Sequence, residues 1–180
     1  MTVKGWRRLL ALAFALLALH HLEELVTLPA FVAPLAGGFT LELPRGRTVP
    51  FASEFYASLA WATLLSAALF LWAAREAAPG KGAFATAWLE VVLLANAAVP
   101  HLTSAVALRR YTPGLATALL VNVPFGVLFL RRARADGRLG RRALFAAIGL
   151  GVVLYPVAIV AVYALGHFSL AGLALAGLIG

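Results

Sequence analysis

The 180-residue sequence contains no cysteine and few charged residues. The absence of cysteine excludes disulfides, thiolate metal ligands and cysteine nucleophiles. Charged residues make up 12% of the chain and hydrophobic residues 63%, whereas soluble domains average about 25% and 45–50%. So few charged side chains cannot cover the surface of a soluble protein of this size. The composition therefore predicts an integral membrane protein with a single domain, residues 1–180.

Five apolar segments are long enough to cross about 30 Å of hydrocarbon as α-helices. Charged residues and prolines mark their ends, as at Pro29, Arg75 and Pro113. The predicted fold class is all-α: a polytopic transmembrane helical bundle of about five spans, followed by a short apolar C-terminal half-helix from residue 169. The predicted spans are 9–28, 54–74, 84–108, 114–130 and 143–165, and residues 30–53 form an outer loop.

Basic residues predict the orientation of the spans. Nearly all of them lie between the apolar segments. If the spans alternate in direction, eleven lie on one side of the membrane, and four lie on the other, namely Arg45, Arg47, Arg109 and Arg110. By the positive-inside rule, this bias predicts a cytoplasmic N-terminus and an external C-terminus. The basic loops are expected to face anionic lipid, and no nucleic acid is expected as a partner.

Ionisable residues occur inside the spans, where each costs at least about 2.5 kcal/mol on insertion scales. The first span contains His20, His21, Glu23 and Glu24. At about 100° per residue, the side chains of His20, Glu23 and Glu24 fall within an arc of roughly 100°. This face is expected to point into the bundle, away from lipid.

The third span carries Glu90, Asn96 and His101. Glu90 and His101 are eleven residues apart, about three turns, so they are predicted to share a face. Pro100 removes the hydrogen bond to the carbonyl of Asn96, and a kink is expected there. Polar residues of the second and fourth spans are expected at a similar level of the bundle, namely Glu54, Thr117 and Asn122.

The order of these residues resembles that of a known family. Residues 20–24 read HxxEE, and Glu90, Asn96, His101 and the segment 111–117 follow. The sequence is similar to the bacterial membrane-protein family named for its HXXEE motif, from His20 to about Pro124. The resemblance implies a multi-span helical protein of a bacterial inner membrane but no activity. It also implies importance for the residues His20, Glu23, Glu24, Glu90, Asn96, His101, Pro113 and Gly114.

Imidazole and carboxylate groups together suit zinc, iron or manganese. We predict a divalent metal, zinc or iron first, between the first and third spans, with His20, Glu24 and His101 as ligands and water in an open position. Glu23 and Glu90 are predicted to be the catalytic acid–base groups or further ligands. The residues predicted to bind substrate or orient the ligands are Asn96, His21, Glu54, Thr117 and Asn122.

The predicted function is a membrane-embedded, metal-dependent enzyme, a hydrolase or an oxidoreductase, acting on a small lipidic or amphipathic substrate. Three alternatives stay open. The same acids could relay protons or cations in a small transporter or channel, act without metal in a lipid isomerase, or pair to hold a structural bundle together. Membrane lipids are expected partners, and a homo-oligomer is compatible with the sequence. The loop 30–53 is expected to cover the outer mouth of the site.

Overall fold

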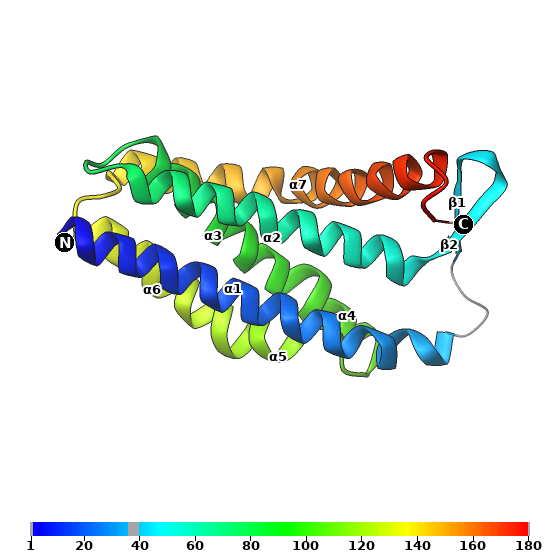
Figure 1. Ribbon diagram of the computed structural model, residues 1–180. Helices are drawn as coiled ribbons and strands as arrows, with labels where there is room; N and C mark the ends of the chain where they lie inside the picture. The colour runs from blue at the N-terminus through cyan, green and yellow to red at the C-terminus, as the bar shows by residue number, and fades with distance from the viewer. Residues whose placement is uncertain (1, 36–39, 180) are drawn as a thin grey trace.

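A computed structural model of the chain describes residues 2–35 and 40–179. Figure 1 shows long helices lying side by side, with the N-terminus at one end of the bundle and the C-terminus beside a small β-hairpin at the other. The helices are α1 (Val3–Val32), α2 (Phe51–Arg75), α3 (Lys81–Asn96), α4 (Ser104–Leu108), α5 (Leu115–Thr117), α6 (Val123–Ala135) and α7 (Arg141–Leu175). The predicted all-α bundle is confirmed.

Two π-helical segments, η3 (Ala97–Thr103) and η4 (Ala118–Asn122), join the shorter helices into longer ones. Within the described residues, five helices are long and apolar enough to cross a membrane: Val3–Val32, Phe51–Arg75, Lys81–Leu108, Leu115–Ala135 and Arg141–Leu175. They contain the five predicted spans, except that the fourth begins one residue later because Gly114 precedes it at φ +77°. Helices of this length and composition indicate a membrane protein.

The apolar C-terminal segment is continuous with α7, so it is not a separate half-helix. α7 passes through Pro156 and ends at Leu175. Gly177, at φ +75°, follows the helix end, and the amide of Leu178 donates to the carbonyl of Leu173. A glycine in the left-handed region is a common helix terminator, and residues 166–175 hold no comparable stop.

The predicted outer loop contains a short hairpin. β1 (Thr40–Leu43) pairs antiparallel with β2 (Arg47–Pro50), and η2 (Pro44–Gly46) makes the turn. Before it, α1 extends to Val32 and η1 (Ala33–Leu35) follows. Leu43 packs against Ala171 and Ala174 near the end of α7. The hairpin therefore covers the C-terminal end of α7.

The main apolar core lies near the N-terminal end of the bundle. Trp6 and Leu10 of α1 pack with Phe129 of α6, and the rings of Trp6 and Phe129 are 5.7 Å apart. The indole of Trp6 also donates to the carbonyl of Ala73. This core fixes α1 against α2 and α6, which sets the level at which the motif residues of α1 lie.

Helix α7 crosses α2 and α3 at glycines. A Cβ on Gly166 would lie 2.3 Å from Oγ of Ser58, and one on Gly151 would lie 2.6 Å from Cγ1 of Val91. Small residues allow membrane helices to approach closely where no hydrophobic effect drives them together. These crossings hold α2, α3 and α7 as one side of the bundle.

Candidate metal centre

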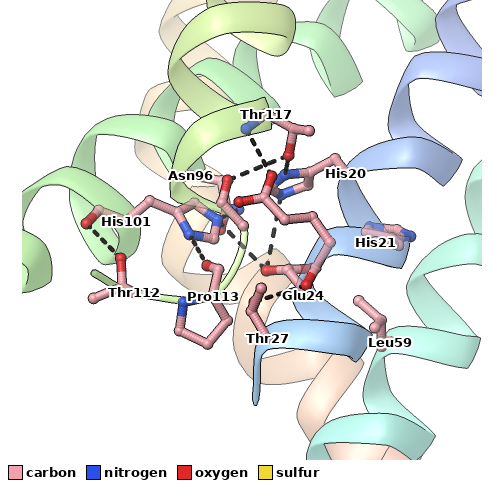
Figure 2. A network of polar contacts seen from close by, with 12 residues as sticks. His20, His21, Glu24, Thr27, Leu59, Asn96, His101, Thr112, Pro113 and Thr117 are labelled. Carbon is pink, nitrogen blue, oxygen red and sulfur yellow. Dashed lines mark hydrogen bonds and ion pairs between the residues drawn. The ribbon is translucent and has the colours of Figure 1, made fainter. Parts of the chain in front are cut away.

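Three potential metal ligands converge from two spans. His20 and Glu24 lie one turn apart on α1, and His101 lies in η3. Figure 2 shows the three side chains pointing toward one another. Nε2 of His20 is 3.8 Å from Oε1 of Glu24, and Nε2 of His101 is 3.5 Å from the same oxygen. All three residues are buried, and one ligand atom from each lies within 4.8 Å of the others.

The π-helical form of η3 determines where His101 points. A π-helix bonds residue i to residue i+5, so residues five positions apart come close together. Nδ2 of Asn96 accordingly lies 2.9 Å from Nε2 of His101. In a regular α-helix these residues would point about 140° apart. Pro100, which lacks an N–H, lies inside the π-helical segment where a kink was predicted.

The contacts of His101 define its protonated nitrogen. Its Nδ1 is 2.7 Å from the carbonyl oxygen of Pro113. A carbonyl only accepts, so Nδ1 carries the proton and donates, and Nε2 of the neutral ring keeps its lone pair. The hydroxyl of Thr112 donates to the backbone carbonyl of His101 over 3.0 Å. The segment 112–113 thus holds His101 with Nε2 toward Glu24.

His20 is held in the same way. Its Nδ1 is 2.8 Å from Oγ1 of Thr117, and that hydroxyl donates to the carbonyl of Gly114 over 3.4 Å. The hydroxyl therefore accepts from Nδ1, which leaves the lone pair on Nε2 of His20. Metal-binding histidines usually donate their other ring N–H to such a partner, which fixes the ring and its tautomer. Both histidines thus keep Nε2 unprotonated and within 3.8 Å of Oε1 of Glu24, and Nε2 of His101 also lies beside Nδ2 of Asn96.

Gly114 closes the site from the side of the fourth span. A Cβ at this position would lie 2.7 Å from Cγ of Glu24, 2.7 Å from Cε1 of His20 and 2.8 Å from Cε1 of His101. Its φ of +77° also favours glycine. The backbone therefore approaches all three candidate ligands at a distance that excludes any side chain.

Glu23 supports the site from outside it. Its carboxylate accepts hydrogen bonds from the backbone amides of Ala116, at 3.1 Å, and Thr117, at 2.7 Å. These amides lie in the first turn of the fourth span, where N–H groups have no partner within the helix and a negative charge is favourable. Glu23 thus anchors the turn that carries Thr117.

Three further predicted residues lie apart from the cluster. Glu90 is buried on α3 and faces α6, because its Oε2 lies 3.4 Å from where a Cβ on Gly126 would stand. Glu90 and His101 are both buried, Glu90 against Gly126 of the fourth span and His101 against Pro113, just before that span. Asn122 is buried at the end of η4. Glu54 on α2 is paired with His167 of α7, its Oε1 3.4 Å from Nδ1.

A cavity of about 540 Å³ adjoins the cluster, between α1, α2, α3 and α7. Glu24, His101 and Asn96 form part of its wall, and most of the remaining wall is apolar. His21 also lines it, with Nδ1 2.7 Å from Oγ1 of Thr63. Two of the three candidate ligands, Glu24 and His101, thus border a space suited to a hydrophobic molecule.

Sequence reasoning missed several contributors. The hydroxyl of Tyr155, on α7, lies 3.3 Å from Oδ1 of Asn96 and lines the cavity. Thr63 and Thr112 were missed because the search for site members started from ionisable residues. Hydroxyl groups inside apolar spans are a further signal, and it would have indicated Thr63 and Tyr155. The contact of the Pro113 carbonyl with His101 could not be predicted from the sequence, because every residue carries a carbonyl.

Comparisons with known proteins bear on the same residues. The model of the family described as "Protein of unknown function with HXXEE motif" matches residues 11–129. This stretch contains His20, Glu24, His101 and Gly114, and it ends within α6. No curated protein and no solved structure matches the chain.

Proposed function

The chain belongs to the family of proteins with the HXXEE motif, and we propose that it is a metal-dependent enzyme embedded in the membrane. His20, Glu24 and His101 bind a divalent ion, zinc or iron, and the adjoining cavity takes a lipidic or amphipathic substrate. One observation carries the proposal: two imidazole nitrogens and a carboxylate oxygen converge, and each imidazole is held on its other nitrogen by a second partner.

The donor set fits catalytic ions of known types. Two histidines and one carboxylate are the protein ligands of many hydrolytic zinc sites and of non-haem iron oxygenases, and both leave positions open for water or substrate. Bound there, the ion would activate water or oxygen or polarise a carbonyl. The chain itself orients the ligands through Thr117 and Pro113, and the apolar cavity wall limits access of bulk water.

The charge bias of the loops supports a place for the site in the membrane. With the side rich in basic residues in the cytoplasm of a bacterium, the N-terminus is inside and α1 runs outward. His20 then lies near mid-membrane and Glu24 in the outer half. A substrate reaches this level from the lipid phase more readily than from water.

A metal-free function is the second candidate, and one contact favours it. The amide Nδ2 of Asn96 lies 2.9 Å from Nε2 of His101, so it can donate to the lone pair that an ion would need. In that case His20, Glu24 and His101 form a relay for proton transfer, as in an acid–base isomerase or a proton carrier.

Metal analysis separates the two candidates. We expect about one zinc or iron per chain in protein purified without chelator, and loss of the ion in both His20→Ala and His101→Ala, because two ligands do not hold a catalytic ion. His167→Ala is the matched control, since it removes a histidine outside the cluster and should keep the ion. Wild-type protein that contains no ion and takes none up would contradict the proposal and favour the relay.

A further inference from the structure

A second hollow, of about 370 Å³, lies between α7 and the start of α2. Ile159 and Tyr163 of α7 line both this hollow and the larger cavity, so the two spaces share a wall. Val160 and Phe168, which also line the hollow, are 66% and 70% exposed on the outside of the bundle. The hollow therefore opens sideways, toward the lipid.

A polar pair lies in this apolar hollow. Nδ1 of His167 is 3.4 Å from Oε1 of Glu54, which is 8% exposed. The close crossing of α7 and α2 at Gly166 places them opposite each other. With Nδ1 directed at the carboxylate as an N–H, the remaining groups of the pair, the second carboxylate oxygen and Nε2, are acceptors. Such a pair favours a ligand that donates hydrogen bonds, and the carboxylate favours one with positive charge.

We propose that this hollow is the lateral entrance for the substrate and that Glu54 and His167 bind its head group, a primary ammonium on a single alkyl chain. The inference rests on the proposed function, because a substrate held in the membrane must reach the cavity from the side. Glu54 lies nine residues from Thr63, the partner of His21, which corresponds to about 14 Å along α2. An alkyl chain anchored at the pair can extend past Tyr163 toward the metal ligands.

Photo-crosslinking of the full chain in neutral detergent tests the entrance. The probes are dodecylamine and dodecanoate, each with a diazirine at the same chain position, and labelled residues are mapped by mass spectrometry. We expect the amine to label residues 159–168 of α7 about tenfold more than the carboxylate does. This ratio corresponds to one charge-assisted hydrogen bond that only the amine can donate to Glu54. Equal labelling by the two probes in the wild-type protein would overturn the proposal without any variant.

Two matched variants locate the charge. Glu54→Gln should reduce labelling by the amine about tenfold. Glu42→Gln removes an exposed acid of β1 and should leave the labelling unchanged. Undiminished labelling of a folded Glu54→Gln protein would contradict a role for the pair.

These experiments test the entrance independently of the proposed metal site. Labelling does not require a metal, so it should persist in His20→Ala, and Glu54→Gln should contain as much metal as the wild type. Protein without metal that is still labelled in a Glu54-dependent manner would retain the entrance and refute the metal site. Metal-bound protein without selective labelling would refute the entrance alone.

Discussion

Two groups of histidine and glutamate occupy different surroundings in this bundle. His20, Glu24 and His101 are enclosed, and Nδ1 of His20 is held by Thr117 of the fourth span and that of His101 by Pro113, just before it. The pair of Glu54 and His167 lies at the start of α2 and near the end of α7, with 36% of the His167 side chain exposed. The same residue types therefore suit different ligands. Oriented lone pairs in an enclosed space suit a metal ion, whereas an open pair beside lipid suits a head group.

The largest effect is expected from Gly114→Ala, which should disrupt only the enclosed group. The new Cβ would stand 2.7–2.8 Å from atoms of all three candidate ligands, and alanine at this φ costs a further 1–2 kcal/mol, roughly. We expect complete loss of bound metal, measured by elemental analysis, with labelling of the entrance hollow unchanged.

Gly137→Ala is the matched control for the backbone. Gly137 has φ +70°, but nothing lies within 4 Å of the point where a Cβ would stand. The unfolding free energy of this variant should fall by about 1 kcal/mol, because alanine is strained at this φ, and the protein should keep the metal. If both variants keep the metal, the close approach of Gly114 does not define the site.

A smaller effect is expected from Thr117→Val, which removes the partner of Nδ1 of His20 and keeps the shape of the side chain. Loss of such a partner typically weakens metal binding by about 10–100-fold. Thr117→Ser retains the hydroxyl and should bind within about threefold of the wild type. Competition with a chelator of known affinity measures both. Equal affinities in the two variants would show that the hydroxyl does not orient His20.

The positions of the spans were predictable from the sequence because bilayer thickness fixes the length of an apolar helix. The packing of the hairpin was not, since it depends on contacts between distant segments, such as Leu43 with Ala171. A hydropathy pattern describes each segment separately. It does not indicate that a loop will pack on the end of a helix much later in the chain.

The convergence of His20, Glu24 and His101 was predictable, because ionisable groups are costly to bury in a membrane span and their presence there indicates a shared site. The contact between Asn96 and His101 could not be predicted, because phase counting assumes an α-helix and η3 follows a π-helical pattern. The capping contact of Glu23 could not be predicted either. Its partners are backbone amides of the fourth span, and no side chain marks them in the sequence.

The smallest effect on the enclosed group is expected from Asn96→Ala, and it distinguishes the metal site from the relay. The amide of Asn96 occupies the lone pair of His101 that an ion needs. If an ion binds there, removing the amide should leave metal affinity unchanged or raise it by up to about threefold. If the residues form a metal-free relay, the same change leaves a buried nitrogen without its donor and lowers the unfolding free energy by about 1 kcal/mol or more. Tyr155→Phe is the control, because it removes only the hydroxyl that contacts Asn96. A tenfold loss of metal affinity in Asn96→Ala alone would instead make Asn96 a residue that orients His101 for the ion.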